Sequence, residues 1–152
     1  MNNNDILRRL RYALNFTDVQ MAKAIAHVAG KSDLDQVGRW LKREDHDNFE
    51  PLSDVGLCRF LDGLIIEKRG PRPDGTIPEP LEFISNNEVL KKLRIALSLR
   101  DEGMMAVFKE ADFVVTKAEL GSFFRKEGQR NFNKCPEQVL RKFINGLGQA
   151  AG

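Results

Sequence analysis

Apolar residues recur along the chain at the spacing of an α-helix. Leucines follow the i, i+3, i+7 pattern twice, at Leu7, Leu10 and Leu14 and again at Leu90, Leu93 and Leu97. This spacing places apolar side chains on one helical face. Alternating apolar and polar runs, which strands need, are absent, so the pattern predicts an all-α fold.

The pattern occurs twice because the sequence contains an internal repeat. Displacing the chain by 83 positions lays residues 3–64 over residues 86–147 without a gap. The matching segments include Asn3–Leu14 with Asn86–Leu97 and Gly38–Glu44 with Gly121–Glu127. A register kept over this length indicates a tandem duplication.

Each copy contains signals for four helices. Capping sequences, in which a Ser or Thr precedes a Glu or Gln by three positions, predict helix starts at Thr17–Gln20, Ser85–Glu88 and Thr116–Glu119. Ser32-Asp33 precedes a third helix, and Pro136 suits the first position of the last one. The fourth helix of the first copy carries a broad apolar stripe at Leu57, Phe60, Leu61, Leu64 and Ile65.

A proline-rich segment separates the copies. Residues 70–80 contain four of the six prolines, and proline cannot continue a helix or a central strand. We therefore expect a first helical repeat at 1–70, a linker at 71–84 and a second repeat at 85–152. A unit of about 62 residues buries a small fraction of its surface alone, so we expect the repeats to pack together with approximate two-fold symmetry.

The composition excludes several classes of protein. With 152 residues, 41% of them hydrophobic, and 24 Lys and Arg against 22 Asp and Glu, the chain is not disordered, collagen-like or disulfide-stapled. No apolar run approaches the roughly 18 residues that cross a bilayer, so we expect no membrane partner. Two isolated cysteines and no secretory signal predict a cytoplasmic protein with reduced thiols.

Residues able to carry chemistry are few. Phosphate-binding loops, nucleophile elbows and metal-ligand spacings are absent, so the sequence predicts no catalytic residue, cofactor or metal site. His27 lies in an apolar helix, His46 lies in a charged loop, and neither has a histidine counterpart in the other copy. Cys58 falls on an apolar face. Cys135 precedes Pro136 beside Lys134, where a helix dipole and the lysine are expected to lower its pKa.

Basic charge is concentrated in the second copy. Residues 85–152 hold 12 basic and 8 acidic side chains, whereas residues 1–70 hold 11 of each. The ends of the third helices and the loops after them carry the candidate polyanion contacts Lys42, Arg43, Arg125, Lys126, Arg130 and Lys134. Such residues suit phosphate contact, although basic residues on helix surfaces are also common solubilising groups.

The same loops share an Asn-Phe pair, Asn48-Phe49 and Asn131-Phe132. One interpretation is a repeated binding surface. The other is structural, with the asparagines in left-handed turns and the phenylalanines filling the core. A helix-turn-helix is a further alternative for residues 20–40, although Asp33 and Asp35 at the start of the recognition helix would face DNA phosphates of like sign.

The repeated Asn-Asn-x-apolar-Leu-basic-basic-Leu-Arg start, together with Phe123–Lys126 and Asn131-Phe132, resembles the YehS-like family of bacterial proteins, a domain of unknown function (DUF 1456). The resemblance extends over almost the whole chain. It implies a cytoplasmic bacterial protein with a duplicated helical fold, and it implies no activity.

Three functions remain open from the sequence. The first is a non-enzymatic module that binds RNA or DNA through the basic ends of the third helices. The second is a protein-interaction or homo-oligomerising adaptor that uses the groove between the repeats, with Met104 and Met105 as adaptable contacts. The third is an enzyme with an unrecognised site.

Overall fold

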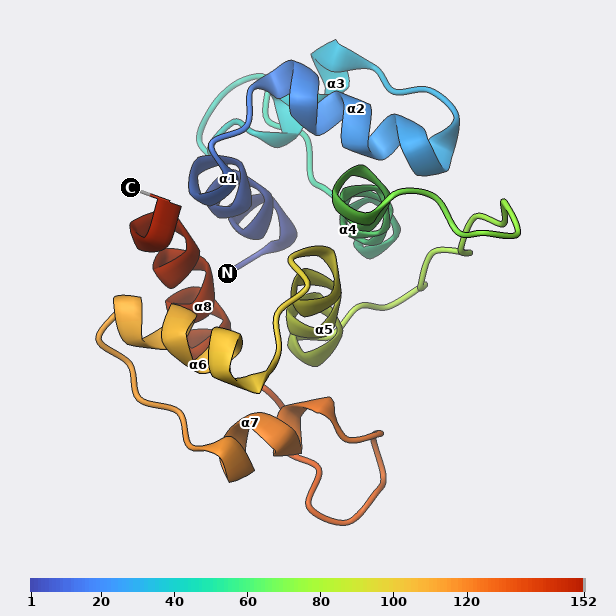
Figure 1. Ribbon diagram of the computed structural model, residues 1–152. Coiled ribbons are helices and arrows are strands. Elements are labelled where there is room, and N and C mark those ends of the chain that lie inside the picture. The colour runs from blue at the N-terminus through green and yellow to red at the C-terminus, as the bar shows by residue number, and fades with distance from the viewer. Residues whose placement is uncertain (152) are drawn as a thin grey trace.

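The computed structural model describes the backbone of residues 1–151 (Figure 1). Within this range it contains eight helices: α1 Asn3–Leu14, α2 Asp18–Ala29, α3 Leu34–Trp40, α4 Asp54–Arg69, α5 Asn86–Ala96, α6 Asp101–Glu110, α7 Lys117–Phe124 and α8 Glu137–Ala151. No segment of the described chain forms a strand, so the all-α prediction is confirmed. Gly152, the last residue of the expected second repeat, lies outside the described residues.

Four helices lie on each side of residues 70–85, and they begin at matching positions. The first residues of α1 to α4 are 3, 18, 34 and 54, and those of α5 to α8 are 86, 101, 117 and 137, each 83 higher. The packing corresponds as well, since α2 contacts α3 and α4 as α6 contacts α7 and α8. Residues 83 positions apart are therefore equivalent in their place along the helices.

The helices begin where the sequence predicts caps. Reciprocal capping boxes form at both expected threonine sites, Thr17–Gln20 before α2 and Thr116–Glu119 before α7. At α5 only half of the predicted arrangement forms, because Ser85 Oγ accepts from the Glu88 N–H and no bond returns from the glutamate. α8 begins directly after Pro136.

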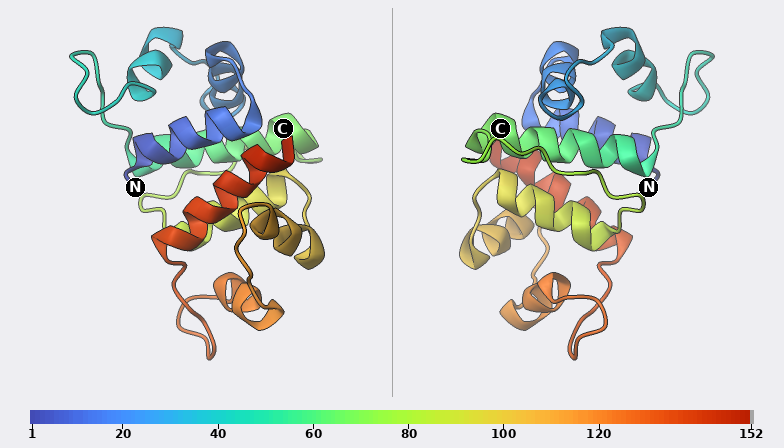
Figure 2. Two further views of the ribbon diagram at one scale, coloured as in Figure 1. Left: turned by 90° about the vertical axis from the view of Figure 1, so that its left-hand side faces the viewer. Right: turned by 90° about the vertical axis from the view of Figure 1, so that its right-hand side faces the viewer.

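Helices α1, α4, α5 and α8 form the centre of the molecule (Figure 1). α4 packs against α5 and α1 packs against α8, so each of the two main contacts between the halves joins a fourth helix to a first helix. Figure 2 shows α2 and α3 on one side of this centre and α6 and α7 on the other. The third helix of each half is thus placed farthest from the other half.

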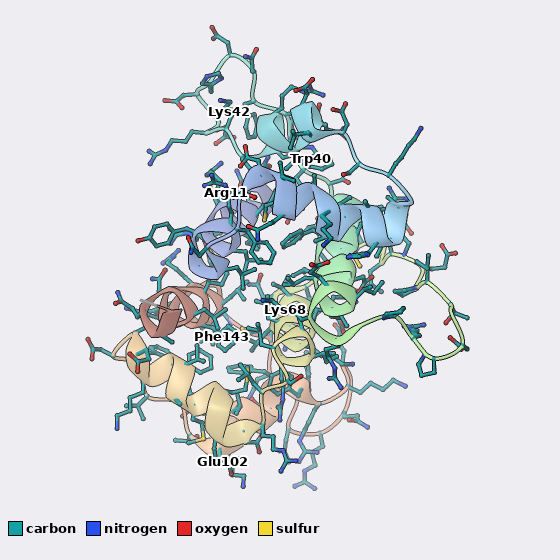
Figure 3. The ribbon with its side chains drawn as sticks, turned by 45° about the horizontal axis from the view of Figure 1, so that its top comes forward. Arg11, Trp40, Lys42, Lys68, Glu102 and Phe143 are labelled. Atoms are coloured by element: carbon teal, nitrogen blue, oxygen red, sulfur yellow. The ribbon has the colours of Figure 1, made fainter. Side chains whose placement is uncertain are left out.

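A single hydrophobic core passes through both halves of the chain. Leu7, Leu61 and Leu90 are fully buried within it. Phe108 of α6 meets the edge of Phe143 of α8 with 5.3 Å between ring centroids, and Figure 3 shows Phe143 in the interior beside α6. Because the core includes helices from both sides of the linker, neither half buries its apolar faces alone.

A buried ion pair joins α4 to α5. Asp62 Oδ1 lies 2.6 Å from Lys92 Nζ, and the two side chains are 3% and 16% exposed. Cys58 Sγ donates to the other carboxylate oxygen of Asp62 at 3.4 Å. At the equivalent place between α1 and α8, Arg9 Nη1 donates to the neutral Asn145 Oδ1 at 3.4 Å. The two contacts are equivalent in position but differ in charge.

Two glycines allow the fourth helices to approach the helices beside them. A Cβ on Gly63 would lie 1.8 Å from the carbonyl oxygen of Ala24 in α2, and a Cβ on Gly146 would lie 2.0 Å from that of Val107 in α6. These pairs are equivalent, and the obstructing atoms belong to the backbone. Only glycine permits this approach of α4 to α2 and of α8 to α6.

We predict that Gly63→Ala and Gly146→Ala each lower the free energy of unfolding by about 3 kcal/mol or more, because the added methyl group forces packed helices apart. Gly38→Ala and Gly121→Ala are matched controls, since nothing lies within 4 Å of the added carbon. These helical glycines should give a gain of about 0.5–1 kcal/mol. Urea unfolding monitored by circular dichroism measures all four, and equal stability of the four variants would contradict the close approach.

Candidate functional site

The candidate site residues, apart from Lys134, lie in two loops with equivalent turns. The first loop (residues 42–49) follows α3, and the second loop (residues 125–132) follows α7. Two turns close each loop with equivalent N–H to C=O bonds: His46 to Arg43 and Phe49 to His46 in the first, Gln129 to Lys126 and Phe132 to Gln129 in the second. The repeat in sequence is therefore also a repeat of hydrogen-bonded turns, although Gly128 and Asn131 have positive φ and their equivalents Asp45 and Asn48 do not.

A buried asparagine holds the first loop at both of its ends. Asn4 Nδ2 donates to the carbonyl oxygens of Trp40 and Glu50 at 2.9 and 2.8 Å, and its Oδ1 accepts from the Leu52 N–H at 3.0 Å. Asn4 is 3% exposed. A buried amide requires partners, and here the backbone on either side of the loop supplies them.

Asn87 is the equivalent residue and forms the equivalent bonds in the second half. Its amide nitrogen donates to Phe123 and Asn133 and its oxygen accepts from Cys135, at 3.0, 2.9 and 2.9 Å. The neighbouring asparagines also correspond, since Asn3 donates to the carbonyl of Leu52 and Asn86 to that of Cys135. The Asn-Asn start of each copy thus positions the loop after the third helix. The sequence shows this pair plainly, but its role requires the fold.

The structure places the two loops at opposite ends of the molecule. α3 and the first loop lie at the top of Figure 1, whereas α7 and the second loop lie at the bottom, and both views in Figure 2 show the same separation. The basic residues of the two loops therefore do not form one continuous face. Any contact through them involves two separate surfaces.

All six predicted basic residues are exposed. None of the six pairs with a carboxylate within the described part of the chain. Figure 3 shows Lys42 at the periphery, on the loop after α3. The first loop also carries Glu44, Asp45 and Asp47, whereas Glu127 is the one acidic residue of the second loop. The second loop is therefore the more basic surface.

The structural interpretation of the Asn-Phe pairs is only partly correct. Asn131 has a left-handed backbone with φ of 66°, whereas Asn48 is not among the residues with positive φ. Phe49 and Phe132 are half-buried and lie outside the hydrophobic core, so the expectation that they fill it is wrong. They close the turns through their N–H groups and leave part of each ring at the surface.

A groove along the contact of α1 with α8 brings together residues that the sequence did not suggest as a group. It has a volume of about 560 Å³ and is lined by Arg8, Arg9, Tyr12, Ala13, Arg43, Ile144, Asn145, Gly148 and Gln149. Tyr12 is 82% exposed. Of the predicted residues, only Arg43 reaches this groove. Side chains of two helices from different repeats meet here, so spacing along one helix could not reveal the site.

The histidines have ordinary partners. His27 Nε2 contacts a carboxylate oxygen of Glu67, and this hydrogen bond holds the pKa of Glu67 below its usual range. His46 Nδ1 accepts from the Asn48 N–H at 3.0 Å within the first loop. No group of three or more His, Cys, Asp and Glu side chains is placed to hold a metal ion in the described part of the chain.

The prediction that Cys135 has a lowered pKa is wrong. Cys135 is 4% exposed, and burial raises the pKa of its thiol to about 12, since removal of water disfavours the thiolate. Its N–H donates to Asn87, so the residue belongs to the asparagine contact. Burial also raises the pKa of the Cys58 thiol, which is fully covered.

Two other expectations change with the structure. Met104 is fully buried in the core and Met105 packs against it, so Met104 is not a surface contact. α2 and α3 are joined by the short segment 30–33, as a helix-turn-helix requires, but exposed Asp33 and Asp35 begin α3. Carboxylates there repel DNA phosphates.

None of the helices described combines the length and the apolar character needed to cross a membrane.

Comparisons with known proteins match both halves of the chain to one family. The family described as Protein of unknown function (DUF1456) matches residues 3–70 and 86–150, and the chain belongs to this family. It is 39% identical over 147 residues to the Uncharacterized protein YehS of Escherichia coli (strain K12), which covers 97% of this chain and 94% of the relative. No solved structure matches the chain significantly.

We predict that Asn4→Ala and Asn87→Ala each reduce the free energy of unfolding by about 2–4 kcal/mol, since each leaves two carbonyls and one N–H without their partner. Amide hydrogen exchange should accelerate in the loop next to the substitution and not in the distant loop. Asn48→Ala is the control, because its side chain is exposed and a surface change has an effect within about 0.5 kcal/mol. Unchanged exchange in both loops would show that the asparagines do not hold them.

We predict that neither thiol of the native protein reacts with a thiol reagent at pH 8, because the nucleophile is the thiolate and both folded pKa values are raised. Both should react in denaturant. An unfolded thiol ionises near pH 8.5, whereas the pKa of folded Cys135 is about 12. The free energy of unfolding therefore keeps the full contribution of the neutral thiol below about pH 8.5 and loses it as the pH rises toward 12. Rapid modification of the folded chain at pH 8 would contradict this burial.

Proposed function

We propose that the chain consists of two copies of one four-helix unit, at residues 1–70 and 85–152, related by an approximate two-fold axis and joined by a linker at 71–84. Equivalent contacts support this arrangement. The asparagine contacts, the two glycine approaches and the ion pairs Arg11–Asp18 and Arg94–Asp101, both at 2.8 Å, all recur at an offset of 83 residues. The two-fold relation also accounts for loops that face opposite directions.

We propose that this module is a non-enzymatic binding protein that contacts a nucleic acid through the two loops. The observation that carries the proposal is the set of exposed basic side chains that pair with no carboxylate of the described residues, on loops whose backbone is held by Asn4 and Asn87. A preorganised loop loses little entropy when it binds, so each phosphate contact is more favourable. Two free, buried thiols support the expected cytoplasmic location.

The two loops differ in their balance of basic and acidic residues, and this difference predicts which loop binds phosphate more strongly. Arg125, Lys126 and Arg130 exceed the single Glu127 in the second loop, and Lys134 follows it. In the first loop, three carboxylates oppose Lys42 and Arg43. Since phosphate contact depends on local positive charge, the second loop should supply most of the affinity.

The test is fluorescence anisotropy with labelled single-stranded RNA, single-stranded DNA and duplex DNA at about 20 and 200 mM salt. We expect binding at low salt that weakens steeply with salt. The triple variant Arg125→Ala, Lys126→Ala and Arg130→Ala should lower affinity at least about tenfold and reduce the salt slope by about two units, since each lost phosphate contact removes roughly 0.7–0.9. Lys42→Ala with Arg43→Ala should have a smaller effect.

A matched control removes the same charge elsewhere. Lys31, Arg100 and Lys109 are exposed and lie outside the loops, so their triple alanine variant has the same net charge as the second-loop variant. Equal losses in the two triple variants would mean that affinity follows net charge only. That result, or no binding of any probe at low salt, would overturn the proposal.

An adaptor that uses the groove between the repeats is the second candidate function. One observation favours it: α1 of the first half and α8 of the second line a groove with an exposed aromatic ring, Tyr12. Exposed aromatic residues are enriched where proteins bind other proteins. This surface is distinct from the second loop, so different probes and variants test the two functions.

A further inference from the structure

Two equivalent helix contacts join the halves of the chain, α4 with α5 and α1 with α8, and each is called a seam below. The linker runs along one of them. The α4–α5 seam carries residues 70–84, and Gly70, Arg72 and Pro78 line its groove together with the two helices. The groove on the α1–α8 seam is lined by residues of α1, α8 and Arg43. Figure 2 shows the linker along the first seam in its right view and no such cover over α1 and α8 in its left view. A single linker covers one seam and leaves its equivalent open.

The covered seam shows what kind of chain fits. Arg69 Nη1 donates to the Ile95 carbonyl at 3.3 Å at one end of the linker, and the Ile84 N–H donates to Asp54 at 3.0 Å at the other. Between these ends the linker has no helix or strand. Pro78 is half-buried and lines the groove with three isoleucines, Ile65, Ile66 and Ile95. The seam thus accepts an extended chain that places a proline on apolar side chains.

The α1–α8 seam has the same arrangement of helices as the α4–α5 seam but different side chains. Tyr12 stands at the position of Ile95, Gly148 at that of Ile65 and Gln149 at that of Ile66. A Cβ on Gly148 would lie 3.8 Å from Tyr12 Cε1, so the missing side chain of the glycine leaves space beside the ring. A second hollow on the other side of Tyr12 shares Ala13 and Gly148 with the first. Tyr12 is therefore accessible from both hollows, whereas isoleucines and the linker leave a smaller groove of about 330 Å³ at the α4–α5 seam, against about 560 Å³ at the α1–α8 seam.

The open seam is also basic. Arg8, Arg9 and Arg43 line its groove, and among the described residues no carboxylate side chain lines it, although Asp18 lines the adjoining hollow. Arg8 already pairs with Asp5 and donates to the Lys42 carbonyl. Within the described chain, Arg9 has one hydrogen bond, at 3.4 Å to the neutral Asn145, and neither Arg9 nor Arg43 pairs with a carboxylate. The charges of Arg9 and Arg43 are thus available to an acidic ligand.

We propose that the α1–α8 seam binds an extended, proline-containing acidic segment of a partner protein. A pyrrolidine ring of the segment packs on the face of Tyr12, in the space left by Gly148, and carboxylates of the segment pair with Arg9 and Arg43. Proline-rich segments suit such a groove because their extended conformation costs little entropy to fix. The linker of this chain is itself rich in proline and acidic residues, since residues 70–84 contain four prolines and three acidic residues against one arginine. The inference rests on the adaptor function, not on nucleic-acid binding.

The test uses the full chain and a labelled synthetic peptide with the sequence of residues 70–84. The tethered linker occupies the α4–α5 seam at high effective concentration, so the free peptide meets the α1–α8 seam as the vacant equivalent. We expect saturable binding below about 1 mM. A peptide with its four prolines replaced by serine and one with its three carboxylates replaced by amides should each bind at least about fivefold more weakly.

Variants of the protein locate the site. Tyr12→Ala should weaken peptide binding about tenfold, whereas Tyr12→Phe, which keeps the ring, should bind as the native chain does. Arg9→Glu with Arg43→Glu should abolish binding. Phe83→Ala and Arg100→Glu are controls that change an exposed aromatic and an exposed basic residue outside the seam. The second-loop triple variant should leave peptide binding unchanged, which separates this test from that of the nucleic-acid proposal.

Three outcomes would overturn the inference. The first is no binding of the peptide at 1 mM. The second is binding that perturbs amide resonances of α4 and α5 instead of α1 and α8, which would mean exchange with the tethered linker. The third is binding of a single-stranded oligonucleotide that is lost in Tyr12→Ala while the peptide fails to compete, which would make the seam a nucleic-acid site.

Discussion

The structure depends on apolar helix faces that neither half of the chain can cover. α2 and α6 cover one face of the fourth helices α4 and α8, and the remaining apolar faces of the first and fourth helices are buried where α4 meets α5 and α1 meets α8. A unit of about 62 residues has too little interior to leave such faces in water. The pairing therefore determines the rest: the four central helices, the two seams, and the outward position of the third helices and their loops.

Polar groups then fix what the apolar faces leave undetermined. Hydrophobic contact is not directional, whereas the buried amides of Asn4 and Asn87 each satisfy three backbone groups at set distances. These bonds join the start of the first helix to both ends of the loop after the third. A loop placed in this way presents charged side chains from a rigid backbone, even though its own side chains contribute little to the core.

The sequence predicts those parts of the fold that local rules determine. Helix positions followed from leucine spacing and from caps such as Thr17 and Thr116, and the offset of 83 residues predicted matching helices. The parts that failed depend on contacts across the fold. Cys135 looks activated from its neighbours in sequence, yet Asn87 and the packing of α8 bury it. The separation of the loops and the α1–α8 groove follow from how the halves are oriented, which no spacing within one helix records.

The two seams differ in their polar contacts, since one carries an ion pair and the other a bond to a neutral amide. At the α4–α5 seam, the Asp62 carboxylate is 3% exposed, and a buried charge is tolerated only beside its opposite, which Lys92 supplies. Loss of Lys92 would leave the buried carboxylate without its counter-ion. At the α1–α8 seam, Arg9 is exposed, and the neutral Asn145 is a sufficient partner. The α4–α5 seam therefore satisfies its buried charge internally, whereas the arginines of the α1–α8 seam retain their capacity to bind a ligand.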